Sequence, residues 1–392
     1  MSEEKNVPNI RFKGFTDPWE QRKLGSAYEI TMGQSPNSNN YTKNPNDFIL
    51  VQGNADIKNG RVVPRMWTKQ ITKLANPGDI ILSVRAPVGD VGITNYTVVL
   101  GRGVASISGD DFIYQTLIKM KTFGFWRKFS TGSTFESINS KDIKNAVILV
   151  PIANERRNIG TIFKSVDATI ALHQQKVTQL KELKKLLMQK IFDQEWRFRG
   201  FTDPWEQRKL GDVSSKVTEK NKSKKYTETL TNSAEYGIIN QYAFFDKSIS
   251  NSNSIASYYV VKRDNFVYNP RISTAAPVGP INRNRLNIIG IMSPLYYVFE
   301  ATNIDKSYLE YYFKTTKWHN FMKIEGNTGA RSDRLAIKDK VLVKMPIPYP
   351  KVKEQKQIGE LFESIDTTIA LHQQKVDQLK ELKKYLMQNL FV

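Results

Sequence analysis

The chain has 392 residues, of which 40% are hydrophobic and 11% aromatic; this is enough apolar material for two or three packed domains and excludes a disordered chain. Its 58 Lys and Arg residues against 38 Asp and Glu give a net charge of +20, which in a folded protein points to a polyanionic partner. The sequence has no cysteine, which excludes disulfide frameworks, cysteine zinc sites and thiol nucleophiles.

The first recognisable element is a short motif that occurs twice. Residues 14–25 and 200–211 both read GFTDPWEQRKLG, separated by 186 positions, so the chain contains an internal repeat. Asp17 suits a helix N-cap, Pro18 the first helical position, and Gly25 the residue that follows the helix. The motif therefore predicts a short helix. We expect its tryptophan to anchor a core in both copies, as Trp19 and Trp205.

The first insert, residues 26–150, follows this motif and mixes two kinds of pattern. Residues 79–84 (DIILSV) and 147–150 (VILV) are typical of buried strands, whereas residues 112–129 favour a helix. The insert carries 14 basic and 9 acidic residues, a net charge of +5. These patterns predict an α+β domain with a basic surface.

A second, longer repeat follows at residues 159–192 and again at 358–391, with 25 of 34 positions identical and an offset of 199. Apolar side chains recur every three or four residues over about four heptads, which indicates a coiled-coil helix. Each apolar stripe needs a partner, so we expect the two copies to pair antiparallel around a pseudo-two-fold axis as a rod of roughly 50 Å. The predicted stripes are Phe163, Val166, Ile170, His173, Val177, Leu180, Leu183, Leu187 and Ile191, and Phe362, Ile365, Ile369, His372, Val376, Leu379, Leu382, Leu386 and Leu390.

The second insert, residues 212–349, is related to the first. The APVG run of residues 86–89 recurs at residues 276–279, and the insert has strand-like runs at 257–261 and 295–299 and a helical run near 305–322. It carries 20 basic and 12 acidic residues, a net charge of +8. One architecture therefore carries two different basic surfaces.

These elements predict an α+β protein made of two similar mixed domains joined by two long helices in an antiparallel coiled coil. The expected segments are residues 1–25 with the first motif, 26–150 as the first domain, 151–211 with the first long helix and the second motif, 212–349 as the second domain, and 350–392 as the last helix.

The motifs of common catalytic sites are missing. The sequence has no G-x-G-x-x-G, no phosphate-binding G-x-x-x-x-G-K-[ST] and no H-E-x-x-H, and residues 269–272 (NPRI) only approach an amino-methyltransferase motif. We expect the three histidines, His173, His319 and His372, to be structural. For His173 and His372, which lie on the apolar stripes, the alternative is a pH-sensitive control of the coiled-coil register. We predict no catalytic residue and no metal site in this chain.

The N-terminal residues lack a basic and apolar signal sequence, and no run of about 18 apolar residues occurs. We therefore expect a cytoplasmic protein with no membrane partner.

Candidate nucleic-acid contacts lie around the recurrent Gly/Pro turns, because loops on a rigid frame can reach base edges and phosphates. Arginine suits bidentate contact with guanine and asparagine suits adenine, whereas lysine more often meets phosphate. Any one of them could instead be an ordinary surface or turn residue. The DNA-binding candidates are Arg85, Arg102, Arg127, Lys128, Ser130, Thr131, Ser133 and Thr134 in the first insert, and Arg271, Ser273, Thr274, Arg283, Asn284, Arg285, Asn327, Arg331 and Arg334 in the second.

The chain resembles the specificity subunit of type I restriction-modification systems over essentially its whole length. The resemblance rests on the duplicated GFTDPWEQRKLG motif, the PGDIIL and RAPVG runs within residues 77–89, and the two long helices with IALHQQKV. The second insert departs from this pattern: it reads Ser273-Thr-Ala-Ala-Pro-Val-Gly where the first has Arg85-Ala-Pro-Val-Gly, so equivalent contacts are not assumed there.

The resemblance implies a non-catalytic subunit whose two target recognition domains each read one half of a bipartite site in double-stranded DNA, with the coiled coil setting the spacer. It also implies two modification subunits that methylate adenine and two restriction subunits, the motor-nucleases. No cofactor is implied for this chain; S-adenosylmethionine, ATP and Mg²⁺ belong to the partner subunits. The alternatives are a basic coiled-coil adaptor that binds nucleic acid or acidic proteins non-specifically, and an enzyme with an unrecognised active site.

Overall fold

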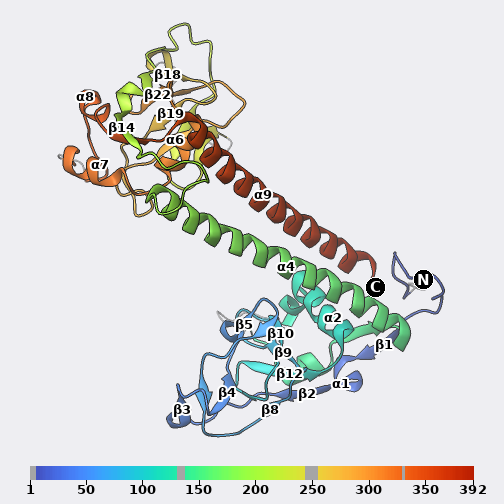
Figure 1. The fold of residues 1–392 in the computed structure, drawn as a ribbon. Coiled ribbons are helices and arrows are strands. Elements are labelled where there is room, and N and C mark those ends of the chain that lie inside the picture. The colour runs from blue at the N-terminus through green and yellow to red at the C-terminus, as the bar shows by residue number, and fades with distance from the viewer. Residues whose placement is uncertain (1–5, 130–136, 243–254, 329–331) are drawn as a thin grey trace. The chain divides into compact units, whose positions relative to one another are not determined.

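The computed structural model describes residues 6–129, 137–242, 255–328 and 332–392, and the chain divides into two compact units (Figure 1). Unit 1 comprises residues 1–175 and 373–392, and unit 2 comprises residues 176–372. Two long helices, α4 (Ala153–Phe192) and α9 (Val352–Asn389), each contribute one part to each unit. Among the described helices, none has the length and apolarity that a membrane span requires.

Unit 1 contains the first insert. Its helices are α1 (Leu24–Ala27), α2 (Asp111–Thr122), α3 (Ser140–Lys144) and the 3₁₀ helix η3 (Phe125–Phe129). Its strands are β1 (Glu20–Lys23), β2 (Glu29–Met32), β3 (Tyr41–Thr42), β4 (Phe48–Val51), β5 (Ile57–Lys58), β6 (Arg61–Val62), β7 (Trp67–Thr68), β8 (Leu74–Ala75), β9 (Ile80–Ser83), β10 (Val91–Ile93), β11 (Val98–Leu100), β12 (Val104–Ser108) and β13 (Val147–Val150). They form sheets in the orders β2-β12-β9-β10-β6-β5, β3-β7-β4-β11-β8 and β1-β13.

Unit 2 contains the second insert. The shorter helices described in this unit are α6 (Lys306–Phe313), α7 (His319–Glu325) and α8 (Asp339–Leu342), with the 3₁₀ helices η4 (Leu210–Asp212) and η5 (Ile255–Ser257). Its strands are β14 (Glu206–Lys209), β15 (Ser214–Lys216), β16 (Leu230–Ser233), β17 (Gly237–Asn240), β18 (Tyr259–Val261), β19 (Phe266–Tyr268), β20 (Ile281–Arg283), β21 (Gly290–Met292), β22 (Tyr297–Ala301) and β23 (Pro346–Tyr349). They form sheets in the orders β15-β22-β19-β20, β16-β17, β18-β21 and β14-β23.

The two inserts share a central antiparallel sheet. The order β2-β12-β9-β10 in unit 1 recurs as β15-β22-β19-β20 in unit 2, and in each the second strand pairs with both of its neighbours. The apolar side chains at the centre of this sheet are almost completely buried, among them Ile80 and Leu82 of β9 and Phe266 of β19. The prediction of two similar α+β domains is confirmed, and the surrounding strands are what differ.

Each insert is anchored on the long helices by the same aromatic cluster. In unit 1, Phe112 of α2 packs against Trp19 and Phe391, with ring centroids 5.7 and 5.3 Å apart. In unit 2, Tyr308 of α6 takes the place of Phe112 and packs against Trp205 and Phe192 at 6.1 and 5.6 Å. The prediction that both tryptophans are core anchors is confirmed, although Trp205 is only partly buried.

The short repeat does not form the predicted helix. Residues 20–23 form strand β1, which pairs antiparallel with β13, and the second copy pairs in the same way as β14 with β23. The Asp17 carbonyl accepts a hydrogen bond from Arg11, whose guanidinium also forms a buried ion pair with Glu155. Strand pairing and this ion pair therefore override the local helix signals of the motif.

The long helices pack along most of the predicted stripe, but one position per helix is wrong. Leu183 and Leu382 are exposed, and the neighbouring lysines lie in the seam instead. In unit 2, Lys184 Nζ lies 2.5 Å from Asp366 Oδ1; in unit 1, Lys383 Nζ lies 2.6 Å from Asp167 Oδ1. A matched polar layer of this kind favours one register of the two helices over shifted ones.

We predict that Asp366→Asn destabilises unit 2 at neutral pH, because it removes the ion pair with the mostly buried Lys184. The loss should be only about 1 kcal/mol, because the Asp366 side chain is 38% exposed and solvent screens the pair in part. Burial acts to raise the pKa of Asp366, but hydrogen bonds from Lys184 and Tyr311 outweigh it and lower the pKa below its usual 3.8. The charge therefore stabilises the fold above about pH 3.8, and this contribution is lost as pH falls through the lowered pKa. Urea unfolding should show the difference from wild type shrinking at low pH.

The matched control is Asp377→Asn on the exposed face of the same helix, where the side chain accepts a hydrogen bond from Gln373. An equal loss of stability in both variants would contradict a specific role for the Lys184–Asp366 layer.

Candidate nucleic-acid interface

In unit 1 the predicted contact residues gather around the end of strand β9. The Val84 N–H donates to the Gly103 carbonyl at 2.9 Å, and the Val84 carbonyl accepts from the Ile138 N–H at 3.0 Å. The loop that carries Arg85 therefore lies beside the turn that carries Arg102. Backbone hydrogen bonds hold the ends of both loops in place, while the side chains of Arg85 and Arg102 are exposed.

The 3₁₀ helix η3 packs against the same loop. A Cβ on Gly89 would lie only 2.7 Å from the Trp126 ring, so glycine, here at φ +89°, allows the close approach. Arg127 and Lys128 follow Trp126 and are exposed, and Lys128 Nζ lies 3.7 Å from the centroid of the Phe125 ring. The structure thus brings together four of the predicted residues: Arg85, Arg102, Arg127 and Lys128. Four others lie outside the described residues: Ser130, Thr131, Ser133 and Thr134.

In unit 2 the equivalent loops meet through short backbone bridges. Arg271 pairs with Arg334, and Asn327 pairs with Ala336 through two hydrogen bonds of 2.9 and 2.8 Å. Ser273 and Thr274 lie in the exposed turn that follows Arg271, where the Ala276 N–H donates to Ser273. The structure therefore brings together five predicted residues: Arg271, Ser273, Thr274, Asn327 and Arg334. Arg331 lies outside the described residues.

The two units use the same strand end for an arginine, although the loop sequences differ. Arg85 bridges Ser137 in unit 1, and Arg271 bridges Arg334 in unit 2. The loop from Arg271 to the recurrent proline is longer than the loop from Arg85. The arginines therefore occupy corresponding positions that alignment on the Ala-Pro-Val-Gly run does not reveal.

Three predicted contacts in unit 2 have partners within the protein. Asn284 is fully buried, and its amide donates to the Lys262 carbonyl at 3.0 Å. Arg283 is mostly buried and pairs with Asp264, with Nε 2.7 Å from the carboxylate. Arg285 lies against two carboxylates, Glu310 and Glu363. The burial of Arg283 and Asn284 does not fit the prediction that they face a nucleic acid. Arg285 is exposed although it pairs with two carboxylates, and its DNA contact stays a prediction.

Arg285 and Glu363 shift each other's pKa. Burial acts to lower the pKa of its guanidinium, but the hydrogen bond to Glu363 and the contact with Glu310 outweigh it and raise the pKa. In turn the pKa of Glu363 is lowered, because hydrogen bonds from Ser307 and Arg285 outweigh its burial. These groups stay ionised and hold α6 against α9.

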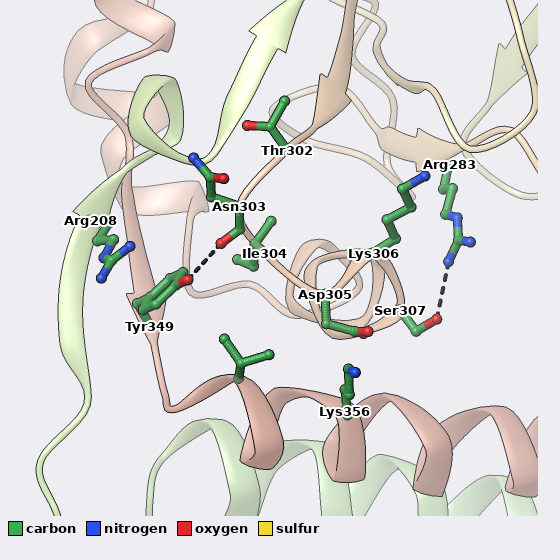
Figure 2. A pocket seen from close by; sticks show the side chains of 11 residues that line it. Arg208, Arg283, Thr302, Asn303, Ile304, Asp305, Lys306, Ser307, Tyr349 and Lys356 are labelled. Atoms are coloured by element: carbon green, nitrogen blue, oxygen red, sulfur yellow. Dashed lines mark hydrogen bonds between the residues drawn. The ribbon is translucent and has the colours of Figure 1, made fainter.

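A cavity of about 730 Å³ lies near this network (Figure 2). Three of its basic lining residues have partners: Arg283 and Lys306 contact Asp264, and Arg208 stacks at 3.7 Å on the Tyr349 ring. Its lining shares only Arg283 with the predicted contacts. We therefore do not include this cavity in the candidate nucleic-acid interface.

Sequence reasoning missed one residue of the unit 1 loop cluster. Ser35 Oγ accepts a hydrogen bond from the Arg102 N–H at 3.1 Å and so positions that turn. A single polar residue in an irregular loop gives no periodic signal, so only the folded chain reveals it. Within the described residues, no three His, Asp or Glu side chains gather as metal ligands would.

Two similar domains with different exposed basic loops, each on a matched coiled-coil segment, define a protein that recognises a polyanion through two surfaces. The family described as "Type I restriction modification DNA specificity domain" matches residues 16–182 and 202–381. The chain belongs to this family, and it has the two recognition domains of a type I restriction-modification specificity subunit. The alternative of a non-specific adaptor is not supported.

Relatives and solved structures agree with this assignment. The type I restriction enzyme MjaVIII specificity subunit of Methanocaldococcus jannaschii is 23% identical over 98% of this chain and 94% of the relative. The putative MjaX specificity subunit of the same organism is 31% identical, over 47% of this chain and 45% of the relative. The type I S subunit from M. genitalium covers 98% of this chain and 99% of its own, at 14% identity and a TM-score of 0.65, and shares the fold.

We predict that Arg271→Ala weakens DNA binding about tenfold, the loss expected when one arginine contact to a base is removed, and leaves the melting temperature unchanged. The dissociation constant is measured on a DNA duplex that the wild-type chain, bound to its partner subunits, selects from a random pool. Arg283→Ala is the matched comparison: it should lower the melting temperature, because the partly buried Asp264 loses its ion pair with Arg283 and keeps only the longer one, of 3.5 Å, with Lys306. Equal effects of the two variants on binding would show that exposure does not separate their roles.

Proposed function

We propose that this chain is the sequence-reading subunit of a type I restriction-modification enzyme, and that its two recognition domains read separate halves of one bipartite DNA site. The observation that carries the proposal is a shared β-sheet frame that presents two different sets of exposed basic loops. Arginines at corresponding strand ends can contact guanine in both halves, while the neighbouring loops differ and so select different bases.

The long helices set the spacing of the two half-sites in this proposal. Each helix contributes to both units, and matched Lys–Asp layers hold its register in each. A helix is a stiff element with a fixed rise of about 1.5 Å per residue, so its length can act as a ruler. A spacer that no domain contacts then separates the two recognised halves.

The outward faces of the long helices support binding of two modification subunits. Leu172 of unit 1 is 64% exposed, and its counterpart in unit 2, Leu371, is 61% exposed. Four further side chains repeat this pattern in exposed positions: Leu183 and Leu186 in one helix, and their counterparts Leu382 and Tyr385 in the other. Apolar side chains exposed at equivalent positions of a repeat suit two copies of one partner.

We assign the chemistry to the partners. The modification subunits would methylate adenine with S-adenosylmethionine, and two restriction subunits would use ATP and Mg²⁺ to translocate and cut DNA. This chain would bind no cofactor of its own and carry no catalytic residue. Its role is to position the methyltransferases on the two half-sites.

The test is to map methylated adenines in cells that carry this chain and its modification partner. A bipartite motif with a fixed unspecified spacer is the expected result. Replacing residues 26–150 with the corresponding segment of another family member should then change one half of the motif only. A contiguous motif, or a change in both halves, would overturn the proposal.

We predict that Leu172→Asp or Leu371→Asp alone removes one of two bound modification subunits, and that the double variant removes both. A charge on the contact face opposes burial of that face by the partner. Native mass spectrometry of the purified complex counts the subunits. Ile71→Asp, at an exposed position of the first insert, should leave the count at two; loss of a subunit in this control, or retention of both in the double variant, would contradict the assigned face.

A further inference from the structure

Each recognition domain touches its long helix at a close backbone approach. A Cβ on Gly160 of α4 would lie 2.9 Å from the Asp111 Cβ, and a Cβ on Gly359 of α9 would lie 2.9 Å from the Ser307 Cβ. The two glycines are counterparts in the long repeat, so Asp111 and Ser307 occupy equivalent positions on the domains. One helical turn further along, the equivalent helix residues are Lys164 and Glu363.

In unit 1 the helix side of this contact is basic and the domain side is acidic. Lys164 Nζ lies 3.3 Å from Asp111 Oδ2 at the start of α2. Arg156, two turns earlier on α4, lies 2.7 Å from the Asp110 carboxylate. Two cations of the helix therefore face two anions of recognition domain 1, residues 26–150.

In unit 2 the helix residue at this contact is acidic instead. Glu363 Oε1 accepts hydrogen bonds from Ser307 at 2.6 Å and from Arg285 at 2.7 Å. Figure 2 shows Ser307 at the start of α6, above α9, with Arg283 donating to its hydroxyl. An anion of the helix therefore faces a hydroxyl and a cation of recognition domain 2, residues 212–349.

The reversal stands out because the helices are otherwise nearly the same. Residues 159–192 and 358–391 are identical at 25 of 34 positions, yet Lys164 becomes Glu363. At another contact, Arg156 corresponds to Gln355, whose side chain accepts from the Asp305 N–H at 2.8 Å instead of pairing with a carboxylate. The domains change with the helices: Asp111 becomes Ser307, and Arg285 supplies a charge that reaches Glu363.

We propose that Lys164 and Glu363 are positioning residues that match each recognition domain to its own helix. Recognition domain 1 transferred to the second position would bring Asp111 against Glu363. Recognition domain 2 transferred to the first position would bring Arg285 against Lys164. Like charges at a partly exposed contact repel, so the two positions of the scaffold are not interchangeable although their backbones are equivalent.

The surroundings of Lys164 in unit 1 differ from those of Glu363 in unit 2. Beside Lys164 lies a cavity of about 1070 Å³, lined by domain residues such as Tyr114 and helix residues such as Ala168. In unit 2 Arg285 reaches across from its domain to contact Glu363 directly. Each domain therefore brings a different charged side chain to the same backbone contact: Asp111 meets Lys164 in unit 1, and Arg285 meets Glu363 in unit 2.

The experiment uses the full chain and a chimera in which residues 26–150 replace residues 212–349, so that recognition domain 1 stands at both positions. Glu363→Lys is made in both. In the parent it should lower the melting temperature of unit 2 by about 2–4 °C, because Glu363 loses Ser307 and Arg285. In the chimera it should raise the melting temperature by a similar amount, because the new lysine meets the transferred copy of Asp111.

Opposite signs in the two chains support the proposal, and equal signs overturn it. Glu381→Lys, an exposed site with the same charge change on α9, should act alike in both chains. If the chimera does not fold, the exchanged pair in the parent decides: Lys164→Glu alone should destabilise unit 1, and Lys164→Glu with Asp111→Lys should restore it. A double variant no more stable than the sum of its single variants overturns the proposal. Neither measurement uses DNA or a partner subunit, so the result stands apart from the proposed function.

Discussion

The close docking of one short helix on one long helix is the constraint on which both halves of this protein depend. Glycine at positions 160 and 359 allows the start of α2 or α6 to approach the long helix, and an aromatic cluster around Phe112 or Tyr308 buries the contact. The buried ion pairs Arg11–Glu155 and Arg197–Glu354 hold the chain that leads into each domain. Because this contact is built twice from equivalent residues, the loops of each domain can vary while its attachment stays the same.

The basic residues behind the net charge of +20 are divided between the fold and the exposed loops. The shared central sheets are apolar, and exposed cations stand on loops at the ends of strand β9 and its counterpart β19. Other cations serve the fold: Lys184 and Lys383 lie in the helix seam, and Arg283 joins a network within unit 2. Basic residues in this protein are therefore of two kinds, and burial with a carboxylate partner separates structural cations from those free to meet phosphate or base edges.

The long helices combine three functions on separate faces. One face carries the apolar seam with its Lys–Asp layers, a second faces the recognition domain, and a third exposes leucines to solvent. Between the aligned copies, the position where a cation is replaced by an anion lies on the domain-facing side, at Lys164 and Glu363. The same repeat can thus keep a common partner surface and a common seam while it distinguishes between two different domains.

Periodicity and repetition, which are properties of the local sequence, determined the larger features: two equivalent α+β domains, the coiled-coil helices and the anchoring role of Trp19. Only the tertiary structure decided the rest. Residues 20–23 form a strand because β13 lies beside them, and Lys184 replaces Leu183 in the seam because Asp366 stands opposite. Likewise Arg283 and Asn284 look like surface residues until Asp264 and the Lys262 carbonyl are placed around them. The reason is physical: a strand's pairing and a charge's partner lie far away in sequence, and neither leaves a local pattern to read.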